Sequence, residues 1–128
     1  MKTIENFEVV GKRAYYRPTG KASFEQAIEM VAAAMVRSRE MQASALLINT
    51  LDLAGLQPPS IFTRHLLAVR WAESAGSTLH VGMVARAELI DPEKIGVLMA
   101  QNRGVSGDVF TTEAAALAWL DSRQGKMP

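Results

Sequence analysis

The chain has 128 residues, of which 48% are apolar and 21% are charged, and its 14 basic and 13 acidic side chains leave a formal net charge of +1. This balance is typical of a globular domain and argues against a dedicated nucleic-acid binder or a polybasic membrane anchor. The sequence contains no cysteine, which excludes disulfides, cysteine nucleophiles and thiolate metal sites.

The length predicts one domain, residues 1–128, with an independent core. Residues 1–8 have no apolar stretch of signal-peptide length. No run of residues approaches the roughly 18 apolar residues of a membrane span. We therefore expect a cytoplasmic protein of bacterial style that does not insert into a membrane.

The first predicted elements are a hairpin and a helix. Residues 7–10 and 13–17 are expected to be strands around Gly11-Lys12, a two-residue turn with glycine at its first central position. Ser23-Phe-Glu-Gln26 is a capping box, because a serine at the cap is followed three residues later by glutamine. The apolar stripe after it predicts an amphipathic helix.

The middle of the chain predicts a buried strand, a long loop and a helix. Residues 45–48 form an unbroken apolar run, which is typical of a central parallel strand covered on both faces. A loop over 51–59 leads to Ser60, which is expected to cap a helix that ends near Ser74, before Gly76. The bulk of that helix is expected to come from Phe62, Leu66, Val69 and Trp71.

The last third predicts two more strands and two more helices. Strands are expected at 79–85 and 105–110. Asp91-Pro92-Glu93 is expected to start the helix over 92–102, which ends at Gly104. That helix should turn Ile95, Leu98 and Met99 inward. Thr111 or Thr112 is expected to cap a final helix, in which the packing residues are Leu117, Trp119 and Leu120.

The predicted order of elements is therefore ββαβαβαβα. Strands that alternate with helices after an opening hairpin predict an α/β fold with a mixed, mostly parallel sheet of about five strands and four helices.

This order and size resemble the STAS domain, named for sulphate transporters and anti-sigma-factor antagonists, and the related lipid-transfer-type α/β domains. The resemblance covers about residues 7–120. It rests mainly on Gly20-Lys-Ala-Ser-Phe-Glu-Gln26, on Leu46-Leu-Ile-Asn49 with the loop after it, and on Asn102-Arg-Gly104 through Val109-Phe110 to Ala118-Trp119-Leu120. The last segment is similar to a group of small bacterial STAS-like proteins of uncharacterised function.

The resemblance implies a switch position at Ser60. Signalling members of the family carry a phosphorylated serine or threonine at the start of the helix after the central strand, usually in an Asp-Ser/Thr-Ser/Thr-Gly context. Here the matching region is Leu51-Asp-Leu-Ala-Gly-Leu-Gln-Pro-Pro-Ser60, so Ser60 has the position but the motif is absent. A plain helix cap is the simpler interpretation of the same serine.

Arg64 and Arg86 are expected near the carboxyl edge of the sheet, close to Asn49, Thr50 and Ser60. Together these residues form a candidate phospho-acceptor or anion site, because arginines bind phosphate and carboxylate by charge-assisted hydrogen bonds. Two solvated surface arginines are the alternative. Met83, Met99 and Trp71 are expected in the core, with the lining of an apolar cavity as the alternative.

No catalytic set, metal site or cofactor motif is expected. His65 and His80 have no spaced acids or cysteines that would complete a metal site, and neither is visibly paired with a serine or an acid. The glycines form no phosphate-binding loop. The leading hypothesis is a non-catalytic regulatory or protein-interaction module with a switch at Ser60 and an unknown protein partner. The alternative is a domain that binds a small apolar or anionic ligand between the carboxyl edge of the sheet and the helices at 60–75 and 92–102. A homodimer through the edge of the opening hairpin is a further hypothesis.

Overall fold

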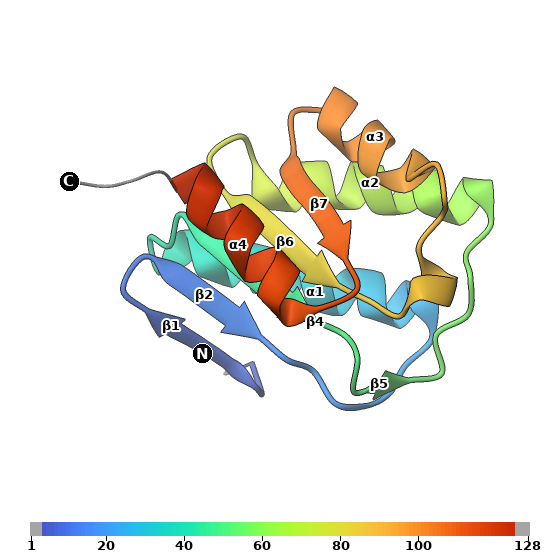
Figure 1. Ribbon diagram of the computed structural model, residues 1–128, viewed down its shortest axis with the longest axis horizontal. Helices are drawn as coiled ribbons and strands as arrows, with labels where there is room; N and C mark the ends of the chain where they lie inside the picture. The colour runs from blue at the N-terminus through green and yellow to red at the C-terminus, as the bar shows by residue number, and fades with distance from the viewer. Residues whose placement is uncertain (1–3, 125–128) are drawn as a thin grey trace.

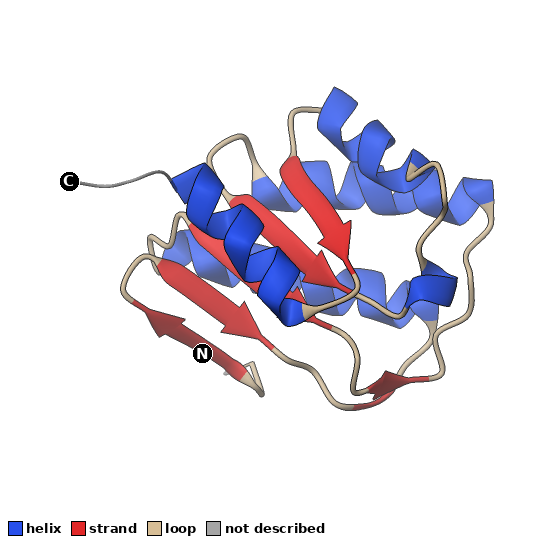
Figure 2. Ribbon diagram, viewed as in Figure 1, coloured by secondary structure: helices blue, strands red, loops and turns tan. Residues whose placement is uncertain are grey.

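A mixed five-stranded sheet, with strand order β1-β2-β4-β6-β7, forms the centre of the computed structural model, which describes residues 4–124. Residues 1–3 and 125–128 of the expected domain lie outside the described part. β1 is antiparallel to β2, and the other neighbours are parallel, so β2, β4, β6 and β7 run the same way (Figure 2). The strands are β1 (Phe7–Val10), β2 (Arg13–Tyr16), β4 (Ala45–Asn49), β6 (His80–Val84) and β7 (Ser106–Phe110).

Helices cover both faces of the sheet (Figure 1). One face packs against α1 (Phe24–Glu40), α2 (Ile61–Ala75) and α3 (Ile95–Asn102), and the other packs against α4 (Glu113–Gln124). The predicted α/β class, with a mostly parallel sheet of five strands and four helices, is confirmed. Among residues 4–124, no helix combines the length and the apolar character that crossing a membrane requires.

Strand β4 contributes side chains to the cores on both sides of the sheet. Leu46 and Ile48 enter the core beneath α1 and α2, while Ala45 and Leu47 enter the core beneath α4. All four side chains are 0% exposed. Burying each leucine or isoleucine contributes roughly 1.5–3 kcal/mol, which explains why this segment reads as an unbroken apolar run.

The local signals at the start of α1 and the end of α2 are confirmed. Ser23 Oγ accepts a hydrogen bond from the Gln26 amide at 3.1 Å, and Gln26 Oε1 accepts one from the Ser23 amide at 2.8 Å. Gly76 follows α2 with a φ of 65°, a left-handed conformation that glycine adopts without a Cβ clash.

The predicted start of α3 at Asp91-Pro92-Glu93 is wrong. Asp91 Oδ2 does accept backbone hydrogen bonds, from the amides of Glu93 at 3.0 Å and Ile95 at 3.2 Å. The chain then passes through Lys94 with a φ of 52°, and the helix begins only at Ile95. A left-handed lysine costs about 1–3 kcal/mol and persists only where the surrounding structure fixes it.

The inward face predicted for α3 is partly wrong, and two of the residues expected to supply the bulk of α2 are exposed. Phe62, Leu66 and Leu98 are 69%, 46% and 52% exposed, whereas Leu67 and Ala68 face the sheet. The start of α2 is apolar around much of its circumference, so periodicity alone does not fix which face is buried.

Two short strands that the sequence did not predict lie beyond the carboxyl edge of the main sheet, before α1 and within the loop over 51–59. β3 (Gly20–Lys21) pairs in parallel with β5 (Leu53–Ala54). The pairing buries Leu53 together with Leu56 and Ala22 in a third, small cluster. A short 3₁₀ turn, η1 (Ala87–Leu89), follows β6. β3, β5 and η1 therefore cover the edge of the sheet at which the parallel strands end.

Gly82 in β6 lets α4 approach the sheet closely, because a Cβ at this position would lie 3.2 Å from Leu120 Cγ. We expect Gly82→Val to lower the free energy of unfolding by about 1–3 kcal/mol through overpacking, measured by urea denaturation. Gly96→Ala is the control, since its added Cβ would lie at an ordinary 3.7 Å from Arg64. A Gly82→Val protein as stable as wild type would contradict the packing described for α4.

Candidate functional site

A cavity of about 140 Å³ lies between the sheet and the three helices of one face. Its wall is almost wholly apolar, with side chains from α1, α2, β6 and α3 that include Ile28, Val31, Leu67, Trp71, Met83 and Val97. The indole Nε1 of Trp71 donates to the carbonyl of Ile28 at 3.2 Å, which fixes the ring in the wall. Of the core residues considered as cavity lining from the sequence, Met83 and Trp71 line it, whereas Met99 packs against the core.

The cavity exists because several lining positions carry little or no side chain. Ala27, Gly96, Ala100 and Gly107 all line it. Gly96 faces Arg64 of α2, and a Cβ added there would lie at an ordinary 3.7 Å from the Arg64 side chain. Larger residues at these positions would fill the space, so the volume is set by composition rather than by a gap between elements.

Five polar side chains belong to the lining of this cavity: Thr50, Arg64, Asp91, Lys94 and Asp108. Thr50 Oγ1 donates to the Val84 carbonyl at 2.7 Å and is thereby satisfied within the fold. The other four are two cations and two anions, so their formal charges sum to zero.

Arg64 is weakly bonded for a guanidinium with so little exposure. Its Nε donates to the Pro59 carbonyl at 3.2 Å, and one terminal nitrogen lies 3.6 Å from Asp91 Oδ1. The side chain is only 15% exposed. Within residues 4–124, the hydrogen bond to Pro59 is the one that its guanidinium donates, although an arginine has five N–H donors.

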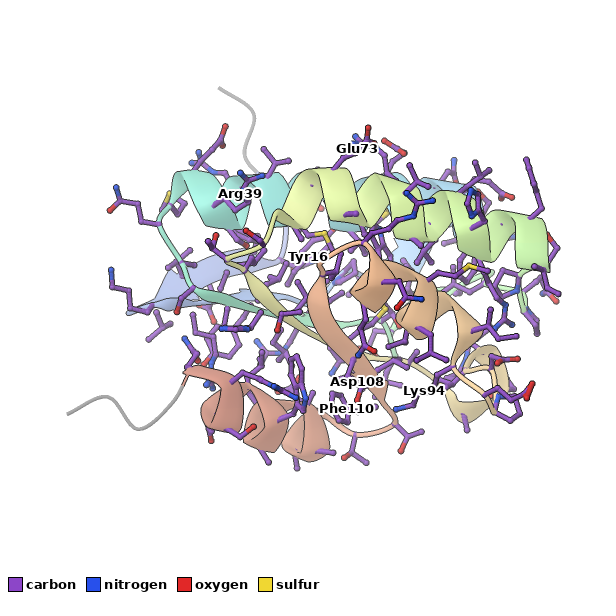
Figure 3. The ribbon with its side chains drawn as sticks, turned by 90° about the horizontal axis from the view of Figure 1, so that it is seen from above. Tyr16, Arg39, Glu73, Lys94, Asp108 and Phe110 are labelled. Atoms are coloured by element: carbon purple, nitrogen blue, oxygen red, sulfur yellow. The ribbon has the colours of Figure 1, made fainter. Side chains whose placement is uncertain are left out.

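Lys94 is bonded more fully, at the free edge of β7. Its Nζ lies 2.9 Å from Asp108 Oδ1, donates to the Val109 carbonyl at 3.2 Å, and lies 5.7 Å from the centre of the Phe110 ring. Figure 3 shows Lys94, Asp108 and Phe110 lying together. Sequence reasoning missed this cluster, since neither a left-handed lysine nor a pair fourteen residues apart has a local signal.

The five predicted site residues have different surroundings in the structure. Thr50 and Arg64 line the cavity, and the other three do not belong to its lining. Ser60 is exposed, and its Oγ accepts from the Thr63 amide at 3.1 Å. Arg86 lies 3.5 Å from Glu88, and its Nε is buried without a hydrogen-bond partner among the described residues.

Asn49 belongs to a separate cluster that fastens α4 to the sheet. Its Nδ2 donates to Glu113 Oε2 at 2.8 Å, and Arg17 binds both oxygens of the same carboxylate at 2.8 and 3.0 Å. The hydrogen bonds from Arg17 lower the pKa of Glu113 against the opposing effect of burial, and Asn49 adds to the lowering. The side chain of Asn49 therefore has a structural partner and is not free for an anion.

His80 forms a pair that the sequence did not reveal. Its Nδ1 lies 2.7 Å from Ser106 Oγ, so the expectation that neither histidine is paired with a serine is wrong. Burial, and then the charge of Arg123, lower the pKa of His80. No acid among the described residues hydrogen-bonds this histidine, and neither member of the pair lines the cavity. Within residues 4–124, no three histidine or acidic side chains are grouped to hold a metal ion.

No protein-family model matches the chain, and comparison with curated proteins yields no similar sequence. The support for a function therefore comes from the geometry of the cavity and of the surface beside it.

Ser60→Ala should lower the free energy of unfolding by about 1 kcal/mol, because it removes the acceptor for the Thr63 amide at the start of α2. Ser60→Asp should retain most of that stability, since aspartate is also a good cap and suits the helix dipole. Urea denaturation of the three proteins checks this order. Equal stability of Ala and wild type would show that the cap contributes nothing.

The lowered pKa of His80 predicts a stability that depends on pH. In the unfolded chain, His80 takes up a proton as the pH falls through its ordinary pKa of 6.5. In the folded chain it remains neutral down to a lower pH, so the free energy of unfolding should fall as the pH drops from 6.5 to the folded pKa. Denaturation at pH 7.5, 6.5 and 5.5 measures the slope. His80→Gln should flatten it, and an unchanged slope would contradict the assignment.

Proposed function

We propose that this chain is a non-catalytic binding domain that holds a small apolar or anionic molecule in the cavity between the sheet and α1, α2 and α3. The observation that carries the proposal is a largely apolar cavity with a few convergent polar groups, which is the usual form of a small-molecule site. Its volume of about 140 Å³ is below the roughly 300–1,000 Å³ of pockets for drug-sized ligands, which favours a smaller molecule.

The position of the cavity supports the same function. It extends to Thr50, Ala85 and Val109, at or just beyond the ends of three parallel strands. Open α/β sheets bind ligands outside the carboxyl ends of their strands. We also propose, on the resemblance of the sequence and the order of its elements, that the domain is STAS-like and related to the lipid-transfer-type domains.

A ligand that binds the folded state raises its melting temperature, and above Kd the rise grows with the logarithm of the ligand concentration. We expect one-ring probes such as phenylacetate or phenethyl alcohol to do so, by up to roughly 10 °C at a hundredfold excess over Kd, measured by thermal denaturation. Val97→Phe should abolish the shift, because Val97 lines the cavity.

Val36→Phe is the matched control, since Val36 lies on α1, is 40% exposed and is not part of the lining. It should leave the shift intact. The proposal is overturned if no probe raises the melting temperature of wild type, or if both variants respond equally.

A protein-interaction module is the second candidate, and one surface favours it. Ile61, Phe62 and Leu66, here called the α2 patch, are 66%, 69% and 46% exposed on the first turns of α2. Exposed apolar groups that lie together favour a partner surface. Ser60 is next to the patch in sequence, so a phosphate there would place negative charge beside the apolar contact and at the positive end of α2.

This candidate requires a partner that depends on both features. Baits of wild type, Ser60→Asp, Ser60→Ala and Phe62→Ser are compared for proteins captured from lysate of the source organism. We expect a partner whose capture changes with Asp but not with Ala and is lost with Phe62→Ser. Capture of the same proteins by all four baits would leave Ser60 as a cap only. A cytoplasmic location and a homodimer through the edge strand β1 stay predictions.

A further inference from the structure

We infer that the ligand of this cavity is a small monocarboxylate, with an apolar part about the size of one aromatic ring and a carboxylate bound by Arg64. The inference rests on the proposed ligand-binding function and adds the size and the charge of the molecule.

The size follows from the volume. An engineered protein cavity of about 150 Å³ with an apolar lining holds one benzene molecule, and the cavity here measures about 140 Å³. An apolar group of about six to eight carbon atoms therefore fills it. A long acyl chain exceeds this volume, so part of it would have to remain outside the cavity.

The charge of the ligand follows from which of the four charged lining residues still has free hydrogen-bonding groups. Asp91 Oδ2 accepts two backbone hydrogen bonds, and Asp108 Oδ1 accepts from both Lys94 Nζ and the Val109 amide. Lys94 is in turn held by Asp108 and the Val109 carbonyl. These three side chains are already bonded within the fold.

Arg64 differs from them. Its Nε hydrogen bond to Pro59 leaves the four terminal N–H groups without a hydrogen bond to any described residue, and Asp91 stands at 3.6 Å, beyond a close ion pair. A carboxylate accepts two parallel N–H bonds from one guanidinium. A single negative charge suits this site better than the double charge of a phosphate, because Asp91 and Asp108 already balance the two cations.

Trp71 supplies a direct measurement. It lines the cavity, whereas Trp119 packs against Phe110 on the opposite face of the sheet. In a Trp119→Phe background, the fluorescence of Trp71 therefore reports the cavity alone. The probes are phenylacetate against phenethyl alcohol, which share a ring but differ in charge, and hexanoate against decanoate, which share a carboxylate but differ in length.

We expect phenylacetate to bind about tenfold or more tightly than phenethyl alcohol, as one strong charge-assisted contact predicts, and hexanoate to bind more tightly than decanoate. Arg64→Gln should reduce the affinity for phenylacetate to that for the alcohol and leave the alcohol unchanged. Arg64→Lys should retain part of the preference, because it keeps the charge but loses the bidentate geometry. Arg70→Gln, on the same helix but paired with Glu29, should change nothing.

The outcomes separate this inference from the proposed function. If phenethyl alcohol binds wild type as well as phenylacetate does, the carboxylate is overturned while ligand binding stands. If decanoate binds as tightly as hexanoate, the size limit is overturned. If no probe changes the Trp71 fluorescence or the melting temperature of wild type, the ligand-binding function itself fails. The comparison of acid with alcohol uses no Arg64 variant, so it stands even if those variants do not fold.

Discussion

The complete burial of the first four residues of β4 is the constraint on which the other layers depend. Ala45, Leu46, Leu47 and Ile48 alternate between two cores and have no exposed surface, so the fold needs helices on both faces at once. Parallel pairing of β2, β4, β6 and β7 then places four strand ends at one edge. On the face with three helices, small residues such as Ala27, Ala100 and Gly107 do not fill the space between the helices and the sheet. The cavity is thus a consequence of how the sheet is covered and of which residues cover it.

What could be read from the sequence was local or strongly periodic. The capping box at Ser23, the cap at Ser60 and the glycine after α2 depend on residues within one turn of each other, and each is present. The run at 45–48 identified the central strand because complete burial leaves no alternation to obscure it. The fold class followed from the order of these elements.

The remainder depended on tertiary contacts that no local pattern encodes. Asp91-Pro92-Glu93 has the composition of a helix start, yet Lys94 turns left-handed and donates to Asp108 and Val109. Phe62 and Leu66 have the hydrophobicity of core residues, but the apolar start of α2 allowed more than one inward face. The candidate site was partly anticipated: Thr50, Arg64, Met83 and Trp71 all line the cavity, whereas Asn49 is tied to Glu113 and Arg86 lies beside Glu88. Such pairings become visible only when distant segments are brought together.

The central claim is that the cavity beneath α2 and α3 receives a ligand, and methyl NMR with a small carboxylate tests it most directly. Saturating phenylacetate should shift the methyl resonances of Leu67, Met83 and Val97, which line the cavity. Those of Leu117 and Leu120, which belong to α4 and pack in the core on the other face, should stay in place. Shifts of equal size on both faces, or no shifts at all, would contradict the account.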